Sequence, residues 1–331
     1  MRIGQKVRVR ERSDVVIGEI ATGPNRYFVL ERLAERREIY RVFDPTAGPG
    51  GDFRALHVLP AGKATEQRLE VLKRVSDGNS NFPTIVDFHR EPERVIVVLA
   101  WIWGTPLQEK LRAARAGDRR QRLSAGEATK RIRGLAHGIS HFHHRANSVH
   151  GDVKPANIVL ARDSNRQFVL IDFGSAWPTE RTMERQEGDG ISLPYCAPEL
   201  LGETPFADFR SDIFSLCVVW YELLTHQIPY GVGGAAGLPE NRDEFAGKLV
   251  AASKLSLDRG KLPAAAWTKI DAALRRGLAL EANRRFSDKS EWLNALDDIQ
   301  HELRTTRRLG LWNQLLLAAL DKIGGKHSEP D

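Results

Sequence analysis

The loop at residues 150–157 constrains this chain more than any other stretch. It reads His-Gly-Asp-Val-Lys-Pro-Ala-Asn and so places an aspartate, a lysine and an asparagine close together. A second aspartate, Asp172, ends an apolar run at 169–171 and is followed by Phe-Gly. Aspartate and asparagine also favour ordinary turns. Phosphoryl transfer, however, needs this whole inventory: a carboxylate that orients a hydroxyl, a cation that offsets charge, and an amide and a carboxylate that hold Mg²⁺.

The order and spacing of the motifs disfavour a chance match. Asp172 follows Asn157 by fifteen residues (157 to 172), and Ala197-Pro198-Glu199 comes later in the chain. From about residue 27 to residue 301 the sequence resembles the eukaryotic-type (Hanks-type) protein kinases. The lysine two residues after Asp152 resembles the serine/threonine-specific branch, and the helical part looks more like bacterial members of the family.

The resemblance implies an α+β fold of two lobes, a small β-rich lobe with one helix and a larger helical lobe, with ATP in the cleft between them. We expect a β-hairpin-like extension over residues 1–26, the small lobe over 27–103 and the helical lobe over 104–303. An amphipathic helix and tail would follow over 304–331. The apolar stripe of that helix, within 309–323, favours packing on its own domain or a partner helix over contact with a membrane surface.

The resemblance also assigns roles within the loop. Asp152 would act as catalytic base or as the positioner of the substrate hydroxyl, and Lys154 would contact the transferring phosphate. Asn157 and Asp172 would bind Mg²⁺, with Mn²⁺ as the alternative metal.

Adenine would be held mainly by backbone and apolar groups. The apolar run at 94–100 predicts a buried strand, and it leads into a Trp-Ile-Trp-Gly segment that resembles the hinge between the lobes. By that resemblance the carbonyl of Ala100 and the amide of Ile102 would bond to adenine. Ala55 would lie above the base, and Val159 would form the floor beneath it.

Two departures from the family pattern fall where the triphosphate would be held. The turn at 34–37 reads Ala-Glu-Arg-Arg and has no glycine, so its backbone cannot approach phosphates closely. His57 stands where the family has a lysine, and imidazole, with a pKa near 6.5, is mostly neutral at pH 7. Either a carboxylate and phosphates raise the pKa of His57, or Lys63 or an arginine of the turn supplies the charge. Glu70 on the following helix would pair with His57 if with anything.

Other residues would support the site without taking part in the chemistry. The resemblance pairs Glu199 with Arg285, places Asp212 beneath the catalytic loop, and brings Ser192 into contact with that loop. Gly151 replaces an arginine that often binds a phosphate on the activation segment (residues 175–196), which argues against a strict need for phosphorylation there. The segment still contains Ser175, Thr179 and Thr182, and the two threonines are candidates for autophosphorylation.

Composition and residue spacing disfavour several other classes of protein and site. The net charge of +6 comes from interspersed acids and bases without an aromatic-interleaved basic stripe, which disfavours nucleic acid as a partner. Cys196 and Cys217 lack metal-type spacing and are expected to be reduced thiols. His137 and His141 share a helix face, but no third ligand at a suitable spacing supports zinc. With no apolar run of about eighteen residues and no signal-peptide-like start, we expect a cytoplasmic location without a transmembrane segment.

The function implied by the resemblance is that of a serine/threonine protein kinase, which transfers the γ-phosphate of ATP to protein hydroxyls. Its partners would be a protein substrate or a signalling partner. The alternative is a pseudokinase, a nucleotide-sensing or scaffold module, motivated by His57 and the glycine-free turn. A small-molecule kinase on the same fold is a third option, disfavoured by Ala197-Pro198-Glu199 and the full activation segment.

Overall fold

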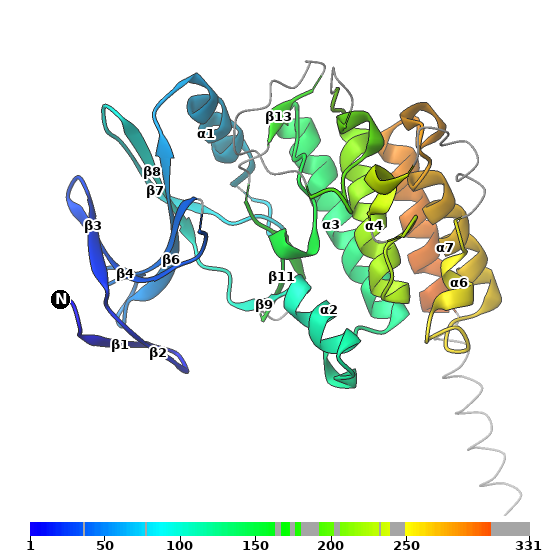
Figure 1. Cartoon of the computed structure of the whole chain (residues 1–331), viewed down its shortest axis with the longest axis horizontal. Helices are drawn as coiled ribbons and strands as arrows, with labels where there is room; N and C mark the ends of the chain where they lie inside the picture. The colour runs from blue at the N-terminus through cyan, green and yellow to red at the C-terminus, as the bar shows by residue number, and fades with distance from the viewer. Residues whose placement is uncertain are drawn as a thin grey trace, which may run out of the picture.

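The computed structural model describes residues 1–35, 37–76, 78–162, 167–172, 176–179, 192–201, 206–231, 233–238 and 249–305. These residues form a β-rich N-terminal part followed by a helical part (Figure 1), the α+β arrangement expected from the sequence. Within the described residues, no helix is both long and apolar enough to cross a membrane. The proposed C-terminal helix at 309–323, Arg36, Ser175 and Thr182 lie outside the described residues.

A six-stranded antiparallel sheet makes up most of the N-terminal part. Its strand order is β3-β4-β5-β6-β8-β7, with bounds Gly18–Thr22, Asn25–Arg32, Glu38–Asp44, Asp52–Pro60, Arg94–Ala100 and Ile85–Arg90 in that order. Because side chains alternate across a strand, β8 sends Val95, Val97 and Leu99 toward the fully buried Leu69 of helix α1 (Lys63–Ser76). The opposite face of β8 buries a second apolar cluster.

The sheet curls so that its two edge strands meet. Asp87 on β7 accepts hydrogen bonds at Oδ2 from Thr22 Oγ1 (3.2 Å) at the end of β3. The same oxygen accepts from Asn25 Nδ2 (2.9 Å) and Tyr27 OH (3.0 Å) on β4. Burial and the Asp87 charge raise the pKa of Tyr27, which therefore stays a proton donor. One carboxylate thus joins the first and last strands of the sheet.

A two-stranded hairpin precedes the sheet, formed by β1 (Lys6–Val9) and β2 (Arg12–Val15). Val7 and Val9 are buried in a cluster against which Trp101 and Trp103 of the hinge segment also pack. Strand β3 lies within the range expected as an extension, yet it pairs with β4 in the main sheet. The domain limits drawn from the sequence stay predictions.

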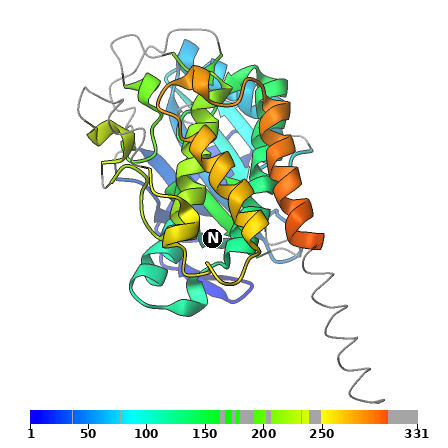
Figure 2. The ribbon, with the colours of Figure 1, turned by 90° about the vertical axis from the view of Figure 1, so that its right-hand side faces the viewer.

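The helical part is built around α4 (Phe209–Thr225), which is buried along most of its length. α3 (Ala125–Ala146) and α7 (Ala264–Gly277) lie beside α4 (Figure 1). A further helix at 289–305 lies next to α7 (Figure 2), where Lys269 Nζ is 3.1 Å from Glu302 Oε2. α2 (Leu107–Arg115) and the short α6 (Ala252–Leu255) complete the described helices.

The site region lies between the large sheet and the helices (Figure 1). A three-stranded sheet of order β12-β11-β9 follows the hinge, with bounds Phe168–Leu170, Ile158–Ala161 and Gly104–Pro106. Gly104 permits this pairing, because a Cβ there would collide with the carbonyl of Leu160. Strand β10 (Ser148–Val149) pairs with β13 (Trp177–Pro178). The loop at 150–157 is therefore held between β10 and β11.

Candidate active site

The loop at residues 150–157, predicted to be the catalytic loop, brings together three of the predicted site residues. Lys154 Nζ lies 2.6 Å from Asp152 Oδ2. Asn157 Nδ2 donates to both the backbone oxygen and Oδ2 of Asp152, each at 2.9 Å. Lys154 also donates to Ser192 Oγ at 2.8 Å, so the predicted contact of Ser192 with the loop is present. The side chains of Asp152 and Lys154 are mostly shielded from solvent, 10% and 20% exposed, and this shielding strengthens their interaction.

Asp212 on α4 fixes the backbone of this loop from below, as predicted. Its carboxylate accepts hydrogen bonds from His150 N (2.7 Å), Gly151 N (2.9 Å) and His143 Nε2 (2.7 Å). Burial alone would raise the pKa of Asp212. The hydrogen bond and charge of His143, with the His150 amide, outweigh burial and lower the pKa. Gly151 adopts φ +75°, a conformation that glycine reaches without a Cβ penalty.

Asp172 lies next to the loop and carries a strained backbone. Ile171 N donates to Asn157 O at 2.7 Å, which joins the end of β12 to the catalytic loop. Asp172 itself has φ +65°, an unusual value for a residue other than glycine, and such strain concentrates at functional sites. Its carboxylate lies against a cation, because Arg37 Nη1 is 3.1 Å from Oδ2 and 3.4 Å from Oδ1. The following Phe173 and Gly174 lie outside the described residues.

The residues present fit a magnesium–nucleotide complex. Mg²⁺ is usually held by one or two carboxylates together with substrate phosphates and waters, not by an all-protein cage. Asp172 supplies a carboxylate, and Asn157, whose Nδ2 is engaged by Asp152, supplies its amide oxygen. The guanidinium beside Asp172 shows that a positive charge is accommodated at this position. Among the described residues, no cluster of three or more His, Cys, Asp or Glu side chains is arranged for a protein-only metal site.

His57 is a neutral, partly buried residue of β6. It lies opposite Ile39 of β5 and Val97 of β8 in the sheet register. Burial lowers its pKa, the Asp172 charge opposes this shift, and the Arg37 charge adds to it, with a net lowering. The hypothesis that a carboxylate makes His57 cationic is therefore not supported in the state described.

Glu70 is not brought to His57. It lies on the exposed face of α1, where Oε1 is 3.4 Å from Lys73 Nζ on the same helix. The neighbouring Leu69 occupies the inward position and packs against β8. Lys63, another candidate cation, is exposed at the first residue of α1.

The residues predicted to hold adenine lie in strands that neighbour the two ends of the hinge segment. Ala55 pairs with Leu99, just before the hinge, and Val159 pairs with Pro106, just after it. Ala100 uses its amide for a 2.8 Å hydrogen bond to Thr84 O. Ile102 is partly exposed between the two tryptophans. Their roles toward adenine remain predictions.

A cavity of about 540 Å³ lies beside Lys154 and extends to α2. It is lined by Gln108, Lys154, Pro155, Ala156, Ser192, Leu193, Pro194 and Tyr195. Tyr195 is anchored by a 2.9 Å hydrogen bond from its hydroxyl to Glu222 Oε2, and Arg115 forms an ion pair with the same carboxylate. Sequence reasoning missed this anchor. A glutamate within the apolar run of α4 was the available signal.

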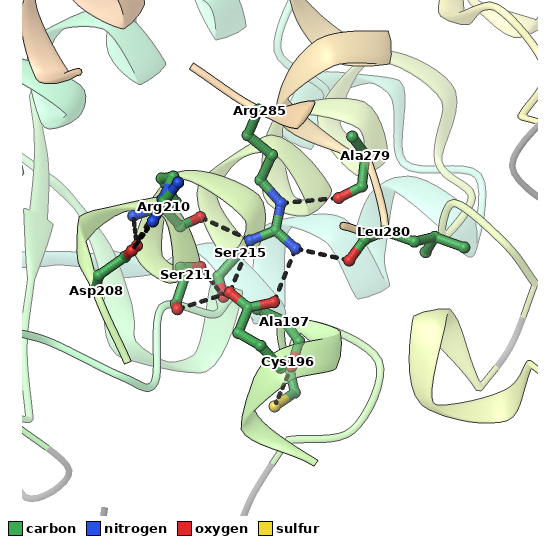
Figure 3. Close-up of polar contacts among 10 residues, drawn as sticks. Cys196, Ala197, Asp208, Arg210, Ser211, Ser215, Ala279, Leu280 and Arg285 are labelled. Carbon is green, nitrogen blue, oxygen red and sulfur yellow. Dashed lines mark hydrogen bonds and ion pairs between the residues drawn. The ribbon is translucent and has the colours of Figure 1, made fainter. Parts of the chain in front are cut away.

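Glu199 and Arg285 form the predicted pair, which fixes the residues just after the activation segment to the late helical region. The Arg285 side chain is fully buried, and that of Glu199 is 21% exposed. Arg285 Nη1 and Nη2 donate to Glu199 Oε1 (2.7 Å) and Oε2 (2.8 Å). Figure 3 shows the guanidinium between the carbonyls of Ala279, Leu280 and Arg210. The two cysteines, Cys196 and Cys217, are buried and form no disulfide.

Comparison with known proteins agrees with this geometry. The protein kinase domain model matches residues 59–274. Human ribosomal protein S6 kinase alpha-4 is 28% identical over 226 residues, 66% of this chain and 26% of that protein. Serine/threonine-protein kinase PknJ of Mycobacterium tuberculosis is 29% identical over 219 residues (64% of this chain, 34% of that protein). Serine/threonine-protein kinase Pkn1 of Myxococcus xanthus is 29% identical over 248 residues (71% and 32%).

The chain belongs to the protein kinase family, and its fold is the protein kinase fold. Both predictions from the sequence are thereby confirmed. Members of this family typically use ATP with Mg²⁺ and act on protein substrates. The chain spans between about a quarter and a third of the length of these three relatives.

Proposed function

We propose that this chain is a serine/threonine protein kinase that uses ATP and Mg²⁺. The observation that carries the proposal is the assembled set of Asp152, Lys154 and Asn157, joined by contacts of 2.6–2.9 Å, with Asp172 beside them. These are the residue types that phosphoryl transfer requires. The 540 Å³ cavity next to Lys154 offers room for a polypeptide segment that carries the acceptor hydroxyl.

The contacts within the catalytic loop assign a separate role to each of its polar side chains. Lys154 and Asn157 hold Oδ2 of Asp152, which leaves Oδ1 to orient the acceptor hydroxyl and take its proton. The hydroxyl oxygen forms a bond to the γ-phosphorus while the bond from that phosphorus to the β-phosphate oxygen breaks, and ADP leaves. Lys154 offsets the charge that spreads over the transferring oxygens. Asn157 and Asp172 would hold Mg²⁺, which neutralises charge on the β- and γ-phosphates.

A pseudokinase that binds nucleotide without transferring phosphate is the second candidate. It is favoured by the neutral His57, the outward Glu70 and the engagement of Asp172 by Arg37. All three features concern the binding of the triphosphate. The residues proposed to carry out the transfer, Asp152, Lys154 and Asn157, are all present.

The test is γ-phosphate transfer from labelled ATP with Mg²⁺ or Mn²⁺, to the chain itself and to serine, threonine and tyrosine peptides. Asp152→Asn should abolish labelling, while Asp118→Asn, an exposed cap of a short 3₁₀ helix, should leave it unchanged. Labelling of serine and threonine peptides that Asp152→Asn removes supports the kinase. Absence of label in the wild type, with ATP still raising the melting temperature, would establish the pseudokinase.

A further inference from the structure

Arg37 connects the two parts of the molecule at the site where the phosphates would be held. It belongs to the turn between β4 and β5, and its Nη1 contacts both carboxylate oxygens of Asp172, 135 residues further along the chain. The two side chains are 35% and 24% exposed. The contact is therefore partly shielded from water.

The other candidate cations are placed elsewhere in the described part of the chain. His57 holds the lysine position but is neutral, Lys63 is exposed at the start of α1, and Lys154 is engaged by Asp152 and Ser192. Arg37, by contrast, is close enough to His57 for its charge to lower the pKa of that imidazole. Its guanidinium offers several N–H donors in a fixed planar geometry.

We propose that Arg37 supplies the phosphate-binding cation in place of the strand lysine, and that Asp172 holds it in position until nucleotide binds. The inference rests on the proposed use of ATP. Asp172 cannot serve a guanidinium and a metal ion at the same oxygens. When the carboxylate acts as a metal ligand, Arg37 leaves it and donates to phosphate oxygens, which a guanidinium binds in bidentate fashion.

This arrangement also accounts for the histidine at position 57. Two permanent cations at this spot would repel each other, and the effect of Arg37 on His57 shows that they are close enough to do so. A neutral side chain at position 57 avoids the repulsion. A lysine there should therefore be useful only when Arg37 is absent.

The experiment measures equilibrium binding of ATP with Mg²⁺, and separately of adenosine, to the full chain by calorimetry. Arg37→Ala should weaken ATP binding about tenfold to a hundredfold, the effect of losing a charge-assisted hydrogen bond, and leave adenosine binding unchanged. Arg37→Gln, which keeps most of the stem, should behave similarly. His57→Lys should restore ATP binding in the Arg37→Ala background but give little gain in the wild type.

Arg26→Ala is the matched control, because Arg26 lies on β4 of the same sheet in an exposed pair with Glu19. ATP affinity that is unchanged by both Arg37 substitutions would overturn the inference, as would a failure of His57→Lys to rescue Arg37→Ala. Binding does not depend on transfer. If ATP affinity depends on Arg37 but no labelling occurs, the proposed function is refuted and the inference is supported. If labelling occurs but ATP affinity does not depend on Arg37, the proposed function is supported and the inference is refuted.

Discussion

Arg285 and Glu199 meet through two parallel hydrogen bonds of 2.7 and 2.8 Å, with the arginine fully buried. The carbonyls of Ala279, Arg210 and Leu280 accept the remaining bonds of the guanidinium. Five acceptors therefore match the five donors of arginine. The pair joins the residues that follow the cavity-lining stretch 192–195 to the last helices of the described part of the chain.

Glu199→Gln should destabilise the fold by about 3–5 kcal/mol, because it leaves the buried Arg285 charge uncompensated. Urea unfolding of the purified chain measures the loss. Glu281→Gln is the control, since Glu281 pairs with Arg284 at 2.9 Å in an exposed position, and its loss should cost at most about 1 kcal/mol. Similar losses in both variants would contradict the special role of the buried pair.

Elements with a strong local signal could be predicted closely from the sequence. The apolar run at 94–100 became β8 with the same bounds. The grouping of polar side chains in the loop at 150–157 could also be predicted, because Asp152, Lys154 and Asn157 lie within six residues and their contacts are local. Short-range patterns carry this information.

Contacts that depend on how elements are rotated or packed could not be predicted. Successive side chains of an α-helix point in directions about 100° apart around the helix axis. Because Leu69 points inward, Glu70 points to the solvent. The ion pair of Arg37 with Asp172 joins residues 135 positions apart. Its formation depends on how the β4–β5 turn approaches the helical part, and no local pattern encodes that approach.

Asp87→Ala should open the curled sheet and cost about 1–3 kcal/mol, because Tyr27 and Thr22 are buried and would lose their acceptor. Hydrogen exchange of the β3 amides should accelerate, since β3 is the edge strand held by this contact. Glu19→Ala is the control on β3 itself, where Glu19 makes only an exposed pair with Arg26. Unchanged exchange in Asp87→Ala would show that the edge strands do not depend on this carboxylate.

Acidification should weaken the fold partly through His57. Its folded-state pKa lies below the ordinary value near 6.5 because of burial, partly offset by Asp172 and reinforced by Arg37. The contribution of neutral His57 to the free energy of unfolding is therefore fully present above pH 6.5. It is lost as the pH falls through the lower folded-state pKa, because the unfolded chain takes up the proton first. His57→Gln should make the stability curve between pH 7.5 and 5.5 shallower, by at most about 1.4 kcal/mol per pH unit.

Urea unfolding at several pH values measures this slope. His144→Gln, an exposed substitution on α3, is the control and should keep the wild-type slope. His150 and His226, whose pKa values are also lowered by burial, would keep part of the acid sensitivity in every variant. A wild-type slope in His57→Gln would show that this histidine does not contribute.

Ser192→Ala should reduce phosphate transfer about tenfold if the proposed function holds. Its hydroxyl accepts a 2.8 Å hydrogen bond from Lys154, and a bond to a charged donor is worth about 1.5–3 kcal/mol. Loss of this bond frees Lys154 to leave Asp152, so the effect should fall on kcat more than on the KM for ATP. Ser192→Thr keeps the hydroxyl and should retain most of the activity. If Ser192→Ala and Ser192→Thr lost the same amount, then local packing, not the hydrogen bond to Lys154, would explain the effect.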